Sequence, residues 1–414
     1  MSARSTLAAA PPDANHSPTP YVVMTEPQRR SIWVERLTLS NFRNYTAAQI
    51  NLGPQPVVLL GANGAGKTNL LEAVSLLAPG QGLRRAQFPQ LARLGGSGDW
   101  AVAAHVNTPN GSVDIGTGRL PGTPTSTSSA RVGRLVRIDG EQQSGSGALA
   151  DWVEMVWLTP ATDGLFTGPA SERRAFLDRL TLCFDPGYRT RAGQFERAMR
   201  QRNRLLQDGV SDAAQFAGLE LIMAETGVAT AAARAEAAAA LGSSILTRRD
   251  RQPDSPFPWS RVALDGWIEQ QLAERAAVDV EDAYLAALKS GRERDRAAGR
   301  ALVGPHRTDV LVEHGPKSMP AHLCSTGEQK ALLIGLVLAH AELIAERRDG
   351  AAPILLLDEI AAHLDVSRRA ALFAEILRLG AQAWATGTDR DDFAALEKQA
   401  LFLQVEHGHA AEMP

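Results

Sequence analysis

The stretch Gly61-Ala-Asn-Gly-Ala-Gly-Lys-Thr68 decides the fold of this chain. The continuous apolar run Val57-Val-Leu-Leu60 precedes it and is typical of a buried strand. The segment from Thr68 to Leu77 has apolar residues at helical spacing until Pro79-Gly80 ends the pattern. Strand, Gly-rich loop and helix in this order are the context that a phosphate-binding loop requires, and the pattern Gly-x4-Gly-Lys-Thr is complete. A chance Gly-rich turn is the alternative, and the flanking strand and helix disfavour it.

The loop predicts a site for ATP with Mg²⁺. Glycines allow backbone N–H groups to face the phosphates. Lys67 would reach the terminal phosphates, and Thr68 would offer its hydroxyl to magnesium. The other loop residues predicted to bind the nucleotide are Gly61, Ala62, Asn63, Gly64, Ala65 and Gly66.

Two adjacent acids follow a second apolar strand, Ile354-Leu-Leu-Leu357. We predict that Asp358 holds magnesium and that Glu359 activates the attacking water. An ordinary helix cap is the alternative, because Asp begins helices well. The same alternative applies to Asp365, which is a plausible N-cap for a helix that runs through Leu377.

The segment Ser325-Thr-Gly-Glu-Gln-Lys330 opens an apolar helix from Ala331 to His340. The string by itself is a capping box. It lies about thirty residues before the paired acids, which is the order of an ABC signature segment facing the ATP of a second subunit. Ser325 and Gly327 are therefore predicted to bind ATP in trans.

Composition restricts the possible functions. The 414 residues include 43 Lys and Arg against 46 Asp and Glu, so DNA contact would require a local basic patch. The two cysteines, Cys183 and Cys324, exclude a zinc ribbon and a disulfide framework, and a reducing cytoplasm is the expected setting. The apolar stretches Val57 to Leu60 and Leu332 to Leu338 are too short to span a membrane, and no membrane contact is expected.

The pattern along the chain predicts an α/β fold with three parts. Residues 1–31 are expected to be a flexible tail, with Met24 as a possible alternative start. Residues 32–168 and 300–414 would form a discontinuous ABC-type P-loop ATPase head with an antiparallel β subdomain, in which Pro121 to Ser129 is left unstructured. Residues 169–299 would form a mainly helical second lobe.

The helical lobe is expected to carry a short antiparallel arm. If residues 189–248 form two helices of about 25 residues, each is about 38 Å long. After this lobe the pattern returns to strands beginning at Asp309, Ile354, Ala383 and Leu401. The predicted strands near the N-terminus are Trp33 to Leu39 and Phe42 to Tyr45, with a polar Ser40-Asn41 between them.

The ordered set of motifs resembles the RecF family of DNA replication and repair ATPases, which is related to the SMC proteins. The resemblance extends from about Val34 to Thr388. Its carriers, besides the phosphate-binding loop, are Leu37-x-Leu-x-Asn-Phe-Arg-Asn-Tyr45, Pro169-x-x-Glu-Arg-Arg-x-Phe-Leu-Asp178, Gly304-Pro-His-Arg307, Ser325-x-Gly-x-Gln-Lys330 and Thr386-Gly-Thr-Asp389.

The resemblance implies a weak ATPase that dimerises around two ATP molecules and binds DNA near junctions of single and double strands. It further implies work with RecO and RecR in loading RecA during gap repair and the SOS response. Arg43, Asn44 and Gln329 are implied to contact the nucleotide. Two departures are visible: Thr308 stands where the family commonly has an acid, and no glutamine-loop residue is identifiable between Ala150 and Asp163.

The predicted DNA contacts are Arg197, Arg200 and Arg204, which share one helix face at i, i+3 and i+7. Other arginines near this face are Arg189, Arg191 and Arg202, and Arg84-Arg85 is a second candidate. A solvated helix face is an equally good interpretation. Two other functions share the fold class: the ATPase subunit of a membrane transporter and an SMC-like chromosome organiser, which would need far longer arms.

Overall fold

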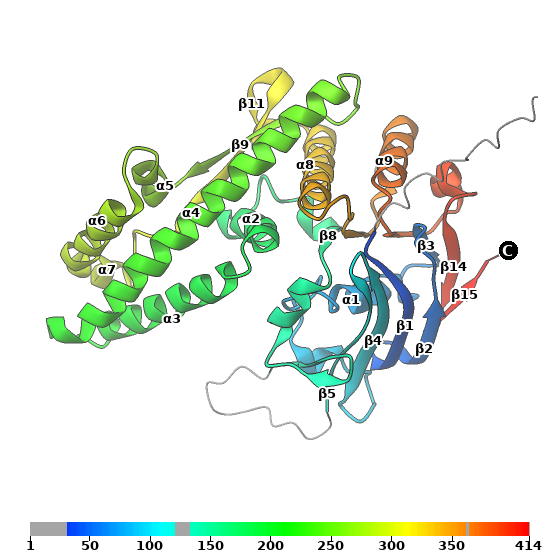
Figure 1. Cartoon of the computed structure of the whole chain (residues 1–414), viewed down its shortest axis with the longest axis horizontal. Coiled ribbons are helices and arrows are strands. Elements are labelled where there is room, and N and C mark those ends of the chain that lie inside the picture. Colours follow the sequence, from blue (N-terminus) through cyan, green and yellow to red (C-terminus); the bar gives the residue numbers. More distant parts are fainter. Residues whose placement is uncertain (1–30, 121–132, 362–363, 414) are drawn as a thin grey trace, which may run out of the picture.

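A mainly parallel six-stranded sheet forms the centre of the predicted ATPase head (Figure 1). Across the sheet the strands are β15 (His409–Glu412), β14 (Leu401–Glu406), β3 (Val57–Leu60), β13 (Ala383–Gly387), β12 (Ile354–Leu357) and β8 (Met155–Leu158). Every residue of β3 and β12 is buried, because a parallel sheet is covered on both faces.

The computed structural model describes residues 31–120, 133–361 and 364–413, so almost all of the predicted tail, Met24 and the segment 121–129 lie outside the described residues.

A second six-stranded sheet is antiparallel, as predicted. Its order is β2 (Tyr45–Asn51), β1 (Trp33–Phe42), β4 (Trp100–Thr108), β5 (Gly111–Arg119), β6 (Leu135–Ile138) and β7 (Glu141–Gln142). Helix α1 (Lys67–Ser75) shares one hydrophobic core with residues of both sheets. The core therefore fixes the helix that follows the phosphate-binding loop between two rigid layers.

The first hairpin corrects one prediction. The chain does not turn at Ser40-Asn41, because β1 continues to Phe42, which pairs with Tyr45 across the two residues Arg43 and Asn44. Such two-residue turns require positive φ, and Arg43 adopts 54°. The turn consequently lies three residues later in the chain than the sequence indicated.

Two helices of the head, α8 (Thr326–Arg347) and α9 (Val366–Leu379), contribute to the core on the other side of the parallel sheet. Asp365 caps α9, since its side chain accepts the Arg368 N–H at 2.9 Å. Short 3₁₀ turns complete the connections, at Phe88–Leu91, Ser146–Asp151, Pro160–Thr162, Gly315–Lys317, Ala321–Leu323 and Asp391–Leu396.

The second lobe is mainly helical, as predicted (Figure 1). Its helices are α2 (Ala170–Phe184), α3 (Tyr188–Gln207), α4 (Ala213–Arg251), α5 (Trp267–Leu272), α6 (Ala277–Ser290) and α7 (Arg292–Ala298). A small antiparallel sheet has the order β11 (Met319–Pro320), β10 (Asp309–His314) and β9 (Ser260–Asp265). The strand beginning at Asp309 thus pairs with β9 and not with the nucleotide strands. This small sheet pairs β9, which precedes position 300, with β10, which follows it. The predicted boundary between the helical lobe and the head at position 300 therefore stays a prediction.

The arm differs from the predicted pair of equal helices. Helix α3 has 20 residues and α4 has 39, so α4 is about 58 Å long. The extra length has a physical reason: the C-terminal part of α4 leaves α3 and packs on α8, where the Ser244 hydroxyl donates to the Ala339 carbonyl at 3.2 Å. Helix α4 therefore connects the arm directly to the helix that begins with the signature segment.

Helix α4 is also long and apolar enough, by length and composition alone, to cross a membrane. Its most apolar window has a mean hydropathy of 1.3, and 50% of that window is buried within the protein. Core helices of globular proteins have the same properties. The hydropathy comes largely from alanine, so this helix carries no argument for a membrane.

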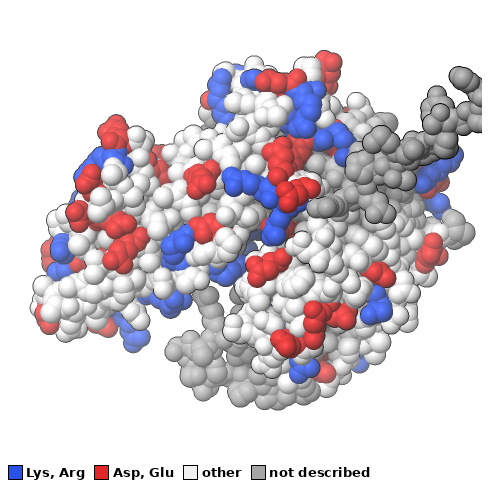
Figure 2. Space-filling view, viewed as in Figure 1, with Lys and Arg blue, Asp and Glu red and all other residues white. Residues whose placement is uncertain are grey.

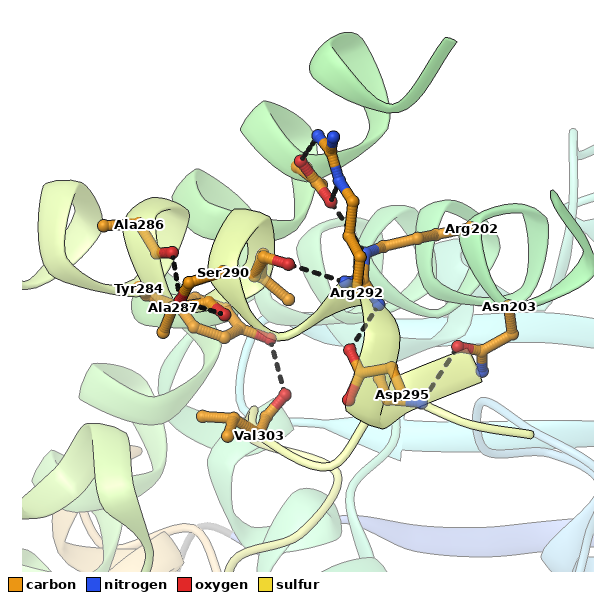
Figure 3. Close-up of polar contacts among 12 residues, drawn as sticks. Arg202, Asn203, Tyr284, Ala286, Ala287, Ser290, Arg292, Asp295 and Val303 are labelled. Carbon is orange, nitrogen blue, oxygen red and sulfur yellow. Dashed lines mark hydrogen bonds and ion pairs between the residues drawn. The ribbon is translucent and has the colours of Figure 1, made fainter. Parts of the chain in front are cut away.

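A network of buried charges joins the helices of the second lobe (Figure 3). Arg202 of α3 donates to Glu220 of α4 at 3.0 Å and to Asp295 of α7 at 2.7 Å. Arg292 donates to the second oxygen of Glu220 at 2.5 Å, and the Arg202 guanidinium also donates to the Leu288 carbonyl. Since all these charges have partners, the lobe can bury them without a large penalty.

Candidate nucleotide-binding site

The loop between β3 and α1 has a backbone that requires glycine. Gly61, Gly64 and Gly66 have φ values of 154°, 82° and 116°. A Cβ at Gly61 would lie 2.3 Å from the Val405 carbonyl, and one at Gly66 would lie 2.5 Å from the Asn44 side chain. The loop ends at the N-terminus of α1, whose first backbone N–H groups have no partner within the helix. This geometry fits a phosphate group.

Lys67 lies beneath the loop. Its Nζ donates to the Gly61 carbonyl at 2.6 Å and to the Ala62 carbonyl at 3.0 Å. Burial lowers the pKa of Lys67, and the nearby carboxylates of Glu359 and Asp358 partly oppose that shift. The ammonium is therefore close to both the loop and the paired acids, where it can neutralise a terminal phosphate.

Thr68 and Asp358 meet although they are 290 positions apart in sequence, because the Thr68 hydroxyl donates to Asp358 Oδ1 at 2.9 Å. A hydroxyl and a carboxylate side by side provide the oxygen ligands that Mg²⁺ prefers, so these residues fit that ion. Asp358 is buried at the carboxyl end of β12, and Glu359 beside it is exposed. The pair thus presents one carboxylate inside the site and one toward its opening.

Thr386 of β13 was not among the predicted site residues. Its hydroxyl donates to Asp358 Oδ1 at 2.9 Å and accepts the Glu359 N–H at 2.8 Å. A signal was available, since Thr386 ends a predicted strand and the carboxyl ends of parallel strands converge at one edge of a sheet. The missing information was that β12 and β13 are neighbours.

The two hairpin residues implied by the resemblance have different positions. The Asn44 amide donates to the Ala65 carbonyl at 3.1 Å, so this side chain contacts the loop. Arg43 instead forms a bidentate pair with the buried Glu72 of α1, at 2.7 and 2.8 Å. The described structure places the Arg43 guanidinium on α1, and its contact with nucleotide stays a prediction.

The signature segment makes its contacts away from the phosphate-binding loop. Ser325 and Gly327 are exposed, and the Ser325 N–H is satisfied by Glu328 Oε2 at 3.0 Å. The Gln329 amide donates to the Cys324 carbonyl at 2.8 Å within the same loop. Arg368 donates to the Gly327 carbonyl at 3.4 Å, which joins the segment to the start of α9. The exposed residues are consequently available to a second molecule.

A groove of about 440 Å³ adjoins Asp358, the predicted magnesium ligand. Asp358 and Thr159 line it together with Arg84, Arg85 and Arg179. Thr159 directly follows β8, the strand beside β12, and it lies within the stretch from Ala150 to Asp163 in which the sequence showed no glutamine-loop residue.

The predicted DNA-contacting arginines are distributed unequally. Arg197, Arg200 and Arg204 are exposed on α3, although Arg200 pairs with Glu196 at 3.2 Å and Arg204 lies 3.8 Å from Asp208. Arg202, which the sequence placed near this stripe, is fully buried in the ion network and cannot contact DNA. On the face seen in Figure 2, Lys and Arg are interspersed with Asp and Glu.

Comparisons with known proteins agree with this geometry. The chain matches the family model described as the RecF/RecN/SMC N terminal domain over residues 33–409. The DNA replication and repair protein RecF of Mesorhizobium japonicum is 55% identical over 376 residues, covering 91% of this chain and 96% of the relative. The same protein from Brucella suis is 51% identical over 384 residues, covering 92% and 96%.

Solved structures show the same architecture. The recombination mediator protein RecF of the RecFOR pathway, described as RecF-ATP, has a TM-score of 0.79 at 19% identity, covering 93% of this chain and 99% of that chain. An SMC head bound to the winged-helix domain of ScpA has a TM-score of 0.52 at 15% identity, covering 92% and 97%. At these identities the likeness concerns the fold alone, and it confirms the predicted ATPase head with an antiparallel sheet and a helical lobe.

Proposed function

Since the chain belongs to the RecF/RecN/SMC family, and within it to the DNA replication and repair proteins called RecF, we propose that ATP controls how it holds DNA during recombinational gap repair. In this proposal two chains close around two ATP molecules on DNA near a junction of single and double strands. RecO and RecR act with the closed dimer in the cytoplasm to aid the loading of RecA. Membership of this family favours such a role over a transporter subunit.

The observation that carries the proposal is the incomplete ATP site. One chain brings together Lys67, Thr68, Asp358 and Glu359, whereas the exposed Ser325 contacts its own loop and Glu328. In the ABC arrangement that the order of the segments implies, an ATP site combines both sets of groups. A second chain would therefore supply the helix N-terminus that the first site lacks.

Each group has a proposed part in ATP hydrolysis. Backbone N–H groups of the loop and the Lys67 ammonium would bind the phosphates. Thr68 and Asp358 would hold Mg²⁺, which on binding supplies positive charge against the phosphate oxygens. Glu359, exposed beside the site, would accept the proton of the attacking water. Turnover would be slow, as expected of a switch and not of a metabolic enzyme.

The signature helix gives a route from ATP to the arm. Helix α8 begins at the segment that would face the second ATP, and α4 of the arm packs against it. Lys330 near the start of α8 pairs with Asp163, which follows β8, at 3.3 Å. Closure of the dimer would thus act on the arm through packed helices, and the exposed Arg197, Arg200 and Arg204 on α3 would meet DNA.

The substitution Glu359→Gln tests the proposal. Loss of the general base should slow ATP turnover by about 100-fold or more, while ATP binding is retained. The ATP-bound dimer should then persist, and its residence time on gapped DNA should lengthen. Single-molecule dwell times and sedimentation with ATP and Mg²⁺ measure both properties.

The matched control is Glu346→Gln, which changes an exposed glutamate on α8 far along the helix from the signature segment. It should behave as the unsubstituted chain. The proposal fails if the Glu359→Gln chain dimerises no better with ATP than without it.

A further inference from the structure

Thr386 lies where the two chemical halves of the ATP site come together. Strand β13 runs between β3, which leads to the phosphate-binding loop, and β12, which leads to the paired acids. Its register places Thr386 beside Leu59 of β3 and one residue beyond the last β12 pair, Leu357 with Ala385. The side chain is completely buried. Its hydroxyl is therefore shielded from bulk water and can bond only to the groups around it.

The hydroxyl bonds to both of the paired acids, Asp358 and Glu359. The hydroxyl donates to Asp358 Oδ1, and the same oxygen accepts the backbone N–H of Glu359. A hydroxyl has one proton, so donation to Asp358 leaves its lone pairs for the Glu359 amide. Thr68 donates to the same Oδ1. Two hydroxyls, one from β13 and one from the first turn of α1, consequently fix one carboxylate oxygen.

The backbone of Glu359 needs such a bond. Its φ is 52°, a left-handed conformation that residues other than glycine rarely adopt. Unfavourable conformations of this kind persist only where the surroundings hold them. The hydrogen bond from the Glu359 amide to Thr386 is the contact that directly holds this peptide, and the conformation determines where the exposed carboxylate is presented.

We propose that Thr386 is a positioning residue of the ATP site: its hydroxyl orients the Asp358 carboxylate for Mg²⁺ and holds the Glu359 peptide in its left-handed conformation. This inference rests on the proposed function, in which Asp358 binds the metal and Glu359 accepts a proton. A purely structural role would require only that the buried volume be filled. Thr386 instead links the metal ligand to the general base, so its loss should affect both.

Four forms of the full chain separate these possibilities: the unsubstituted chain, Thr386→Val, Thr386→Ser and Thr386→Ala. Valine keeps the volume without the hydroxyl, serine keeps the hydroxyl without the methyl group, and alanine lacks both. Two quantities are measured, the rate of ATP turnover and the Mg²⁺ concentration that half-saturates binding of the fluorescent analogue mant-ATP. Thermal unfolding verifies that each variant is folded.

Thr386→Val should lower turnover by about 10- to 100-fold and raise the half-saturating Mg²⁺ concentration by about 10-fold. Binding of mant-ATP without Mg²⁺ should be unchanged, and Thr386→Ser should stay close to the unsubstituted chain. If valine prevents folding, the difference between serine and alanine decides the question. The inference is overturned if valine leaves both quantities unchanged or if serine loses as much as alanine. If the unsubstituted chain bound Mg²⁺ and nucleotide but never hydrolysed ATP, the proposed function would be contradicted. The Mg²⁺ titration would then still test whether the Thr386 hydroxyl orients Asp358.

Discussion

Arg202 is the residue on which the interior of the arm most depends. Its side chain is completely buried, and it bonds to Glu220 and Asp295, which are themselves buried. A guanidinium in this setting offers several donors in a fixed plane, so it can satisfy acids from two helices at once (Figure 3). It thereby joins α3, α4 and α7 at one point, and the exposed arginines of α3 are held on a rigid helix.

Replacing Arg202 with Met should destabilise the protein by about 3 to 5 kcal/mol, because it leaves buried carboxylates without their partner. Arg292 also pairs with Glu220 and limits the loss at that residue, so Asp295 should be the more affected acid. Urea unfolding followed by circular dichroism measures the effect. Arg200→Met, on the exposed face of the same helix, should change the free energy of unfolding by less than about 1 kcal/mol. Equal effects of the two substitutions would show that the buried network contributes little.

At the scale of residues, local motifs were predictable and partners were not. Lys67 and Thr68 follow from a contiguous pattern whose glycines serve one backbone conformation. Thr386 and Arg202 depend on contacts with residues distant in sequence, such as Asp295, 93 positions away. A single arginine at helical spacing does not reveal which face of its helix is covered.

Helix α8 is the element that connects the signature segment to the core. Its middle turns are buried from Ala331 to Ile344 apart from the partly exposed Gly335, and His340 lies among them with no partner for either ring nitrogen within the described residues. The ring packs edge-on against Phe176 at a centroid distance of 6.0 Å. Burial, with a contribution from the charge of Arg179, lowers the pKa of His340 to about 3. The imidazole is therefore neutral in the folded protein.

This histidine should make stability depend on pH. Its pKa is lower in the folded protein than in the unfolded chain, where it is about 6.5, so the unfolded chain binds the extra proton as the pH falls. Between pH 7 and pH 5 the free energy of unfolding should consequently decrease by about 2 kcal/mol through this residue. His340→Leu should remove that decrease, whereas His409→Gln, at an exposed position, should retain it. Urea titrations at both pH values give the free energy of unfolding of the three chains. If this free energy decreased equally in all three between pH 7 and pH 5, His340 would not contribute.

Elements whose pattern is continuous were predicted well. The strands β12, β13 and β14 and the cap at Asp365 lie where apolar runs and a helix-starting acid placed them. The length of α4 was not predicted, because its C-terminal part is stabilised by α8 through contacts such as Ser244 with Ala339, 95 positions apart. Helix length there depends on tertiary packing and not on local preference.

At the scale of the whole molecule, charge is balanced and any DNA surface must be local. The formal net charge is −3, and both signs occur together on the face shown in Figure 2. The exposed arginines of α3 belong to the lobe that packs on α8, the helix that in the proposed dimer would face the ATP of a second chain. The affinity for DNA phosphates would therefore depend on the position of the arm.

The salt dependence of DNA binding measures this surface. If six phosphates are contacted, log K should fall with log salt with a slope of about −5. Replacing Arg197, Arg200 and Arg204 with Gln should make the slope shallower by about 2.7, at 0.9 for each contact. The control variant replaces Arg36 and Arg137, which are exposed on the antiparallel sheet, with Gln. It should keep the full slope. An unchanged slope in the triple variant would make these arginines a solvated helix face.

The proposed ATP site is shared by two chains, so a single chain cannot display it. The sequence predicted it from the order of the segments, since Ser325 precedes the paired acids in the way that an ABC signature does. The structure adds that Ser325 and Gly327 are exposed and that their loop is braced by Arg368. Neither observation includes the second chain, so the sharing stays a proposal.

Mixing two complementary variants tests that sharing most directly. Both chains carry Glu359→Gln; one also carries Lys67→Ala, which weakens its phosphate-binding loop, and the other carries Ser325→Arg, which blocks its signature segment. Mass photometry with ATP and Mg²⁺ counts monomers and dimers of each chain alone and of the mixture. We predict that each chain alone stays monomeric and that the mixture forms dimers, because the loop of one chain can meet the signature of the other. Dimers in either chain alone, or none in a mixture under conditions where Glu359→Gln by itself dimerises, would contradict the shared site.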